Sequence, residues 1–407
     1  MRRVLDILLK NFIQIGTLTV TFSDGSTRRY QGAHRGGEAA LEITTLKTEY
    51  ALALNPGLSF GEEYMEGHII PKNCTLKTLL HLLMQNMENH SLLGEEINAR
   101  FRQVARVMRP LNSLKRSRFN VAHHYDLSGE LYALFLDKDL QYSCAYFERE
   151  DMSLEDAQEA KKRHIASKLR LNRPGLEVLD IGCGWGGMAL TLAKDYGAKV
   201  LGITLSVEQL NVARRRAKEA NLEHLVRFEL LDYRNLYRKF DRIVSIGMFE
   251  HVGVKQYETF FNSIRHCLKH DGVALIHSIG RMDGPGTTNP WIAKYIFPGG
   301  YSPALSEVFA SIEQTGLWVT DCEILRLHYA LTLEQWHKRF SEHREEIRAL
   351  YDDRFIRMFE LYLLASEQAF RLQGHMNFQL QLTPSIEAVP LTRDYMFKEE
   401  SSKKERQ

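Results

Sequence analysis

The sequence has few cysteines, and none of them is spaced for a metal site or a disulfide framework. Its five cysteines are odd in number and far apart, and no two of them form a C-x-x-C pair. Neither a zinc knuckle nor a set of structural disulfides is therefore indicated. The pairs "HH" (123–124) and "EH" (250–251) also lack the H-E-x-x-H spacing of helical zinc sites. We predict no metal site.

Long apolar segments and a strong net charge are also lacking. No stretch is both uncharged and long enough to span a bilayer. Asp6 and Lys10 interrupt the apolar start of the chain, and no small-residue cleavage site follows it, so we expect a cytoplasmic protein. The 407 residues carry a formal net charge of +2, which provides no overall field to attract a polyanion. We expect no nucleic-acid partner, and any attraction to phosphate must come from local clustering.

One such cluster occupies a predicted linker, residues 100–120. It contains no acidic residue between its first and last cation, and its basic members are Arg100, Arg102, Arg106, Arg109, Lys115, Arg116 and Arg118. One interpretation is the solvated face of a connecting helix. The other is a contact with anionic phosphate, in lipid headgroups or in nucleic acid.

Residues 1–99 are predicted to form a small α+β domain. Val4, Leu8 and Phe12 mark one face of an amphipathic helix at its start. Residues 17–32 contain two short β runs around a Ser-Asp-Gly-Ser turn, which predicts a hairpin.

Residues 121–383 are predicted to form a second, larger domain. Strands are expected at 176–182, 199–205, 226–232, 240–247 and 273–280, with helices at 188–196 and 206–220. This alternation predicts an α/β fold with a doubly wound, mainly parallel, Rossmann-like sheet. Helical additions are expected after the sheet, followed by a tail at 384–407.

A glycine-rich turn, "VLDIGCGWGG" (178–187), joins the first of these strands to a helix. Gly182, Gly184 and Gly186 allow positive φ angles and a close approach of a ligand to the backbone. Dinucleotide sites use a similar turn, so the pattern by itself leaves the ligand open. Asp180 ends the strand just before the glycines, where its carboxylate suits a cationic ligand and disfavours a pyrophosphate.

The ends of the next two strands favour S-adenosylmethionine over NAD. Thr204, Leu205 and Ser206 stand where an NAD site has an Asp or Glu for the ribose. They depart from the commonest methyltransferase pattern as well, so the ribose must find other partners. Asp232 and Tyr233 end the third strand with an acid and an aromatic ring, which suit the amino group and the face of adenine. We therefore expect S-adenosylmethionine.

Several motifs together resemble the cyclopropane fatty acid synthase family, including its mycolic acid cyclopropane synthase relatives. They are "HHYDLS" (123–128), "QYSCAYFERED" (141–151), "VLDIGCGWGG" (178–187), "GITLS" (202–206), "DRIVSIGMFEHVG" (241–253) and "LIHSIG" (275–280). The resemblance implies a class I S-adenosylmethionine methyltransferase that converts cis double bonds of acyl chains into cyclopropane rings. "GLSFGEEYMEGHI" (57–69) resembles the smaller N-terminal domain of the longer, phospholipid-acting members. We therefore expect a homodimer that acts on unsaturated membrane phospholipid and lies peripherally at the inner face of the membrane. The N-terminal domain, residues 1–99, would serve either lipid capture or dimer contacts.

The resemblance also implies site residues. A bound bicarbonate ion serves the family as general base, and its contacts correspond here to Cys144, Glu250, His277, the backbone N–H of Ile279, and Tyr329. The cofactor contacts correspond to Tyr125, Tyr142, Ser143, Asp180, Gly182, Gly184, Gly186, Thr204, Leu205, Ser206, Gln209, Asp232 and Tyr233. From the residues alone, the favoured interpretations are a buried small hydrophobe for Cys144 and a hydrogen-bonded core histidine for His277. One position departs from the family: Ser366 replaces a cysteine that many members carry in a C-terminal helix.

The motifs are also compatible with other functions. The same methyl transfer can give methyl-branched chains or methylate a small amine, as in plant relatives of the family. A non-catalytic lipid-binding protein and an NAD dehydrogenase are disfavoured by the motifs. Residues 280–303, with Trp291, Tyr295 and Phe297, form a candidate lid over the acyl-chain opening.

Overall fold

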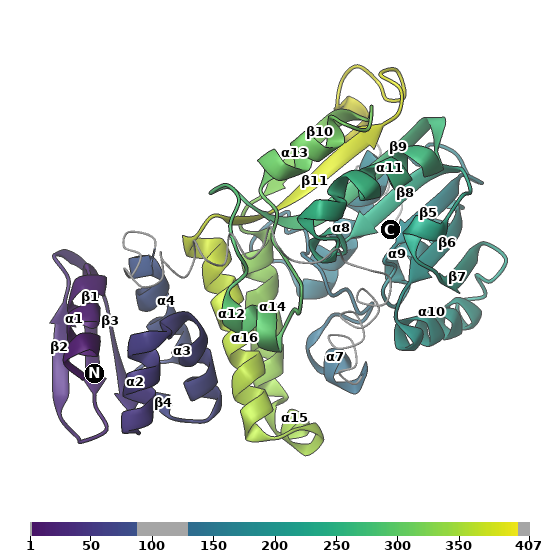
Figure 1. Cartoon of the computed structure of the whole chain (residues 1–407). Helices are drawn as coiled ribbons and strands as arrows, with labels where there is room; N and C mark the ends of the chain where they lie inside the picture. Colours follow the sequence, from purple (N-terminus) through teal and green to yellow (C-terminus); the bar gives the residue numbers. More distant parts are fainter. Residues whose placement is uncertain (1, 88–128, 398–407) are drawn as a thin grey trace. The chain divides into compact units, whose positions relative to one another are not determined.

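The computed structural model describes residues 2–87 and 129–397 (Figure 1). The basic cluster at 100–118, Tyr125 and the last ten residues, 398–407, lie outside the described residues. No helix within the described ranges is both long and apolar enough to cross a membrane.

The described residues form two compact units, and neither unit is continuous along the chain. The first unit comprises residues 2–87, 287–298 and 333–375, and the second comprises 129–286, 299–332 and 376–397. This division differs from linear domain boundaries, because most of the post-sheet helices belong with the N-terminal residues.

The first unit contains a four-stranded sheet covered by helices (Figure 1). Its strands are β1 (Ile15–Thr21), β2 (Thr27–Gln31), β3 (His34–Ile43) and β4 (Ile69–Pro71), in the order β2-β1-β3-β4. β1 and β2 pair antiparallel around the predicted turn, so the hairpin is confirmed. The helices that precede and follow these strands are α1 (Arg2–Phe12), α2 (Leu46–Leu54), α3 (Pro56–Met65) and α4 (Leu76–Met87).

The buried face of α1 differs from the predicted one. Leu5 and Phe12 are buried, whereas the Val4 side chain is 44% exposed. The prediction was right for Phe12 and wrong for Val4, because apolar i, i+4 spacings starting at Val4 and at Leu5 are both present in this leucine-rich segment.

The later segments of the first unit are helical. They are α12 (Pro290–Tyr295), most of α14 (His328–Glu342), α15 (Arg344–Leu350) and α16 (Asp353–Leu372), which carries the half-buried Ser366. Trp291 of the predicted lid is only 3% exposed, and its Nε1–H donates to Met65 Sδ at 3.1 Å. Tyr295 Oη donates to Glu62 Oε1 at 2.9 Å. These two aromatic side chains of the candidate lid are therefore anchored on α3.

The second unit is built on a seven-stranded sheet with the order β10-β11-β9-β8-β5-β6-β7. Its strands are β5 (Glu177–Ile181), β6 (Lys199–Thr204), β7 (Val226–Leu230), β8 (Phe240–Ile246), β9 (Leu268–Arg281), β10 (Trp318–Leu325) and β11 (His375–Thr383). The pairs β5–β6, β5–β8, β6–β7 and β8–β9 are parallel, which confirms the predicted α/β fold.

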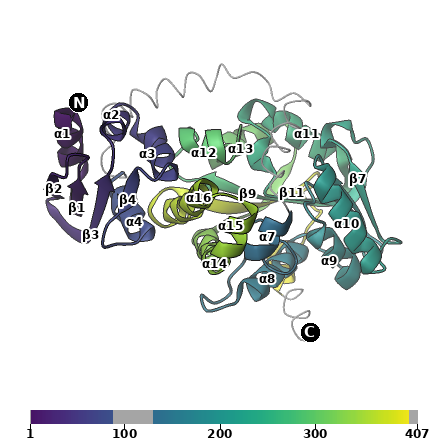
Figure 2. The ribbon, with the colours of Figure 1, turned by 90° about the horizontal axis from the view of Figure 1, so that it is seen from below.

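Helices cover both faces of this sheet (Figure 2). One face packs on α8 (Leu154–Lys168), α9 (Gly187–Tyr196) and α10 (Val207–Glu219), and the other packs on α11 (Tyr257–Cys267) and α13 (Leu305–Ile312). Along β5, Val178 points into the first of these cores and Leu179 into the second, as strand alternation requires.

The antiparallel pair β10 and β11 lies where mainly helix was expected. β11 reads "HMNFQLQLT", and its polar side chains Asn377, Gln379 and Gln381 are all at most 1% exposed. The strand alternates apolar and polar residues, which is the pattern of a half-buried strand, so a sequence signal for β11 was present and was missed. The pattern does not reveal that the amide face is buried as well, because that depends on the neighbouring segments.

Candidate functional site

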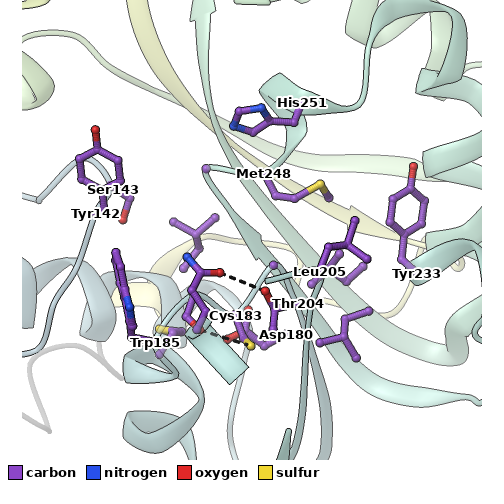
Figure 3. Close-up of a pocket in the computed structure, with 18 of the residues that line it drawn as sticks. Tyr142, Ser143, Asp180, Cys183, Trp185, Thr204, Leu205, Tyr233, Met248 and His251 are labelled. Atoms are coloured by element: carbon purple, nitrogen blue, oxygen red, sulfur yellow. Dashed lines mark hydrogen bonds between the residues drawn. The ribbon is translucent and has the colours of Figure 1, made fainter. Parts of the chain in front are cut away.

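A pocket in the second unit lies at the carboxyl ends of the parallel strands β5, β6, β7 and β8 (Figure 3). This is the edge at which open α/β sheets bind their ligands, because the strand-to-helix loops gather there. Most of the predicted cofactor residues line it, namely Tyr142, Ser143, Asp180, Gly182, Gly184, Thr204, Leu205, Gln209, Asp232 and Tyr233.

The glycine-rich turn shapes the floor of the pocket. Gly182, Gly184 and Gly186 have φ angles of 79°, 54° and 87°, a region that favours glycine. A Cβ atom at Gly184 would have no heavy atom within 4 Å, so the backbone is open to a ligand there. Gly186 does not line the pocket; a Cβ there would lie 2.7 Å from Cζ of Phe228, so it is needed for packing.

Asp180 contributes a buried carboxylate to this floor. Its side chain is 2% exposed, and its Oδ2 atom has no hydrogen-bond partner among the described residues. Burial raises the pKa of Asp180 to about 7, and the positive charge of Lys161 opposes that rise. A buried carboxylate without a partner is costly, so a cationic ligand would satisfy it. The ammonium and sulfonium groups of S-adenosylmethionine meet this requirement.

The residues after β6 form a small hydrogen-bonded group at the start of α10. Thr204 Oγ1 donates to Gln209 Oε1 at 3.0 Å and accepts from the N–H of Ser206 at 3.1 Å. Ser206 Oγ in turn caps α10 by accepting from the N–H of Gln209 at 3.3 Å. Ser206 does not line the pocket. It therefore fixes the orientation of Thr204 and Gln209, which do.

The residues after β7 lie across the pocket from Tyr142 (Figure 3). The Asp232 carboxylate accepts from Arg234 Nε at 2.8 Å and from Arg234 Nη2 at 2.7 Å. The Tyr233 ring lies edge-on to Phe260, with centroids 5.3 Å apart. Arg234 thereby holds the Asp232 carboxylate in place, while the Tyr233 ring is available as an apolar wall.

Met248 and His251 line the pocket but were missed by sequence reasoning, whereas Trp185 lies within the segment Asp180–Gly186 that was predicted to contact the cofactor. The labels in Figure 3 show all three around the rest of the predicted set. Burial lowers the pKa of His251 to about 4, so this imidazole is neutral near pH 7. Trp185 lies inside the glycine turn and His251 directly follows Glu250. Their positions next to predicted site residues could therefore have indicated that they line the pocket.

Glu250 lies outside the pocket lining, in the short 3-10 helix Phe249–His251 that follows β8. Its Oε1 atom accepts from the N–H of Ile279 at 2.7 Å, whereas its buried Oε2 atom has no partner among the described residues. Burial raises the pKa of Glu250 to about 7, against the hydrogen bond from Ile279. The structure thus brings two predicted residues together, but the Ile279 N–H, predicted to donate to an anion, donates to Glu250.

His277 is held by two side-chain amides of β11. Its Nε2 atom lies 3.2 Å from Asn377 Nδ2, and its Nδ1 atom lies 3.1 Å from Gln379 Nε2. Burial lowers the pKa of His277 to about 3, so the ring is neutral and carries one N–H. Since one ring nitrogen donates and the other accepts, one amide must present its oxygen and the other its nitrogen. Both ring nitrogens are thus engaged within the sheet, as in the core-histidine interpretation.

Cys144 and Tyr329 lie near the start of α14. Cys144 is 1% exposed, and burial raises the pKa of its thiol well above the ordinary value. The next residue, Ala145, donates its N–H to Thr332 Oγ1 at 3.0 Å, one helical turn beyond Tyr329. A thiol with a raised pKa is a poor nucleophile, because the thiolate is the reactive form. No group of three or more His, Cys, Asp or Glu side chains in the described part of the chain is placed to hold a metal ion.

The sequence matches the family described as mycolic acid cyclopropane synthetase over residues 112–380. It is 39% identical over 332 residues to the cyclopropane-fatty-acyl-phospholipid synthase of Escherichia coli (strain K12), covering 81% of this chain and 84% of that protein. It is 40% identical over 291 residues to a probable fatty acid methyltransferase of Pseudomonas putida, covering 68% of this chain and 73% of that protein.

A solved structure shows the same fold. The mycolic acid cyclopropane synthase CmaA1, complexed with SAH and CTAB, matches with a TM-score of 0.61 and 34% identity, covering 65% of this chain and 97% of that chain. The class I S-adenosylmethionine methyltransferase fold is therefore confirmed.

Proposed function

Because the chain belongs to the mycolic acid cyclopropane synthetase family, we propose that it forms cyclopropane rings in membrane phospholipids. In this proposal it transfers a methylene group from S-adenosylmethionine to the cis double bond of an unsaturated acyl chain. The observation that carries the proposal is the pocket at the strand ends, with an open glycine turn and the unpaired Oδ2 of Asp180.

The residues of the pocket fit the cofactor. Bound S-adenosylmethionine supplies an electrophilic methyl group. Asp180 offers a buried carboxylate to its cationic amino-acid end, and Gly184 leaves the backbone accessible. Tyr233 offers an aromatic wall and Asp232 a carboxylate for an adenine ring. Burial of these groups also keeps water from the reacting methyl, which matters because an alkene is a weak nucleophile.

After methyl transfer, a proton must leave the new methyl group before the ring can close. We assign the removal of this proton to a base bound next to Glu250. The free Oε2 atom of Glu250 would accept a hydrogen bond from a base that carries an O–H. Bicarbonate is such a group, and Cys144 and Tyr329 are the further residues that would hold it. In this arrangement Ile279 orients Glu250, and Asn377 and Gln379 orient His277.

We further propose a peripheral contact with the membrane and a homodimer. The support for the contact is the basic cluster at 100–118, whose cations suit anionic headgroups. Neutralising four of its arginines to Gln should weaken binding to phosphatidylglycerol vesicles at low salt. Unchanged binding would refute the contact.

The direct test is to incubate the protein with S-adenosylmethionine and vesicles of unsaturated phospholipid and then to analyse the released fatty acids. We expect products one methylene heavier that show cyclopropyl proton signals. Glu250→Gln is the matched control, because it keeps the size of the side chain and leaves the cofactor pocket unaltered. Absence of any methyl incorporation by the wild-type protein would refute the proposal.

A second candidate is methyl branching, in which the methylated carbocation loses a proton to give an alkene that a separate hydride donor then reduces. The relative from Pseudomonas putida, named a probable fatty acid methyltransferase, favours it. The same assay, repeated with a nicotinamide hydride donor added, distinguishes the two, because a branched chain gives a methyl doublet and no cyclopropyl signals. Methylation of a small amine would give no lipid product.

A further inference from the structure

A buried lysine lies directly behind the pocket wall formed by Gln141, Tyr142 and Ser143. Lys161, on α8, is 0% exposed, and its Nζ atom lies 2.6 Å from Gln141 Oε1 and 2.9 Å from Ser143 Oγ. Both acceptors belong to pocket-lining residues, whereas Lys161 itself does not line the pocket. Lys161 therefore acts on the pocket through its hydrogen bonds to two lining side chains.

The direction of these hydrogen bonds is fixed by chemistry. An ammonium group donates and cannot accept, so Gln141 Oε1 and Ser143 Oγ are both acceptors. The amide nitrogen of Gln141 then donates to Asp139 Oδ2 at 2.9 Å. The Ser143 hydroxyl has one hydrogen, which does not point at Lys161. Ser143 is thus set as a hydrogen-bond donor.

The charge of Lys161 is not neutralised by a direct ion pair. Of the acids near it, Asp180 is affected by the charge of Lys161 but its Oδ2 forms no hydrogen bond. The other two are occupied elsewhere: Asp137 accepts the backbone N–H groups of Asp139 and Gln141, each at 2.9 Å. Asp139 pairs with Lys162 Nζ at 2.7 Å and with Arg216. Among the described residues, no carboxylate forms a salt bridge with Lys161. A buried ammonium without a carboxylate partner leaves the pocket wall favourable to an anion.

We propose that Lys161 is a positioning residue that selects for the α-carboxylate of the cofactor by orienting Ser143 as a donor toward it. Asp180 and Lys161 then give the pocket an acidic and a basic pole, matched to the two charges of an amino-acid group. This inference rests on S-adenosylmethionine as the proposed cofactor, but it concerns binding and is independent of the lipid reaction.

The test compares two ligands by isothermal titration calorimetry with the full-length protein. S-adenosylhomocysteine carries the α-carboxylate, and 5′-methylthioadenosine lacks the whole carboxylate and amino end. Lys161→Met should weaken S-adenosylhomocysteine binding about tenfold to a hundredfold and leave 5′-methylthioadenosine within about twofold, because only the first loses a charge-assisted contact. Ser143→Ala should act in the same direction, and the double variant should add little to Lys161→Met.

Lys168→Met is the matched control, because Lys168 is 2% exposed on the same helix but pairs with Glu323 and Asp321. Its ratio of the two affinities should equal that of the wild-type protein. If Lys161→Met weakened both ligands equally, or neither, the lysine would only hold the fold and the proposal would be overturned. If Lys161→Met failed to fold, Ser143→Ala would decide alone, and an unchanged affinity ratio would overturn the proposal. A negative result in this binding test would refute only the role of Lys161, because the proposed lipid reaction is tested by the separate vesicle assay.

Discussion

Asp180 should make cofactor affinity depend on pH. Its carboxyl group has a pKa raised to about 7 by burial, and only the ionised form can pair with a cationic ligand. Affinity should therefore fall as pH decreases through 7. With that pKa, about half of the protein is ionised at pH 7, about a tenth at pH 6 and about a hundredth at pH 5.

The expected loss of affinity is about fivefold from pH 7 to pH 6 and about tenfold from pH 6 to pH 5, or about 1.4 kcal/mol per tenfold step. The measurement is the dissociation constant of S-adenosylhomocysteine by calorimetry in buffers of different ionisation enthalpy, which also reports the proton released on binding. His251, in the pocket, and Lys161, behind it, titrate outside the range from pH 5 to pH 7. Their pKa values are shifted to about 4 and about 8.

Asp180→Asn supplies the control, since it keeps the shape and removes the titration. Its affinity at pH 7 should be lower than that of the wild-type protein and should stay level down to pH 5. For the unliganded protein, the pH dependence of folding stability has the opposite sign. When folding raises the pKa of a carboxyl group, the folded protein loses stability as pH rises from the unfolded-state pKa to the folded-state pKa. For Asp180 these values are 3.8 and about 7. The unliganded variant should therefore be more stable at pH 8, by at most about 4 kcal/mol. A wild-type affinity that is constant from pH 5 to pH 7 would refute the reasoning.

Three further substitutions test other parts of the site. Glu250→Gln should reduce lipid product at least about 100-fold, because the carboxylate that would hold the bicarbonate base is lost, while calorimetry shows unchanged S-adenosylhomocysteine binding. Near-normal product would contradict the assignment. Cys144→Ser should reduce product about tenfold, since it changes one weak hydrogen bond; complete loss in the same assay would indicate a nucleophile instead. Gly186→Ala should lower the free energy of unfolding by about 2 kcal/mol in urea titrations, because its Cβ would lie 2.7 Å from Phe228 Cζ. Gly175→Ala, where no atom lies within 4 Å, should cost about half as much, and equal losses would contradict the packing argument.

The sequence was informative where local chemistry decides the structure. The glycine turn and the alternating strands and helices of the second unit were predictable, since each depends on residues close together in the chain. Asp232 and Tyr233 were found in the same way, because they lie within three residues of the end of β7.

The rest depends on contacts between distant segments. Lys161 reads in the sequence as one of several cations on a helix, and only the fold buries it against Ser143, 18 positions away. Asn377 and Gln379 read as surface residues, but they hold His277 from a neighbouring strand. Neither pairing leaves a local pattern, because the partners are brought together by the order of strands in the sheet.

The order of strands also has a consequence for how the enzyme is made. β11 lies between β9 and β10 in the sheet, although it is the last of the strands along the chain. β10 therefore leaves the ribosome before the neighbour that joins it to the sheet has been synthesised. Because β11 also supplies the amides that hold His277, the surroundings of His277 can take their final form only after nearly the whole chain is complete. Until then, the edges of β9 and β10 that pair with β11 lack their partner, and unpaired strand edges of this kind favour aggregation during folding.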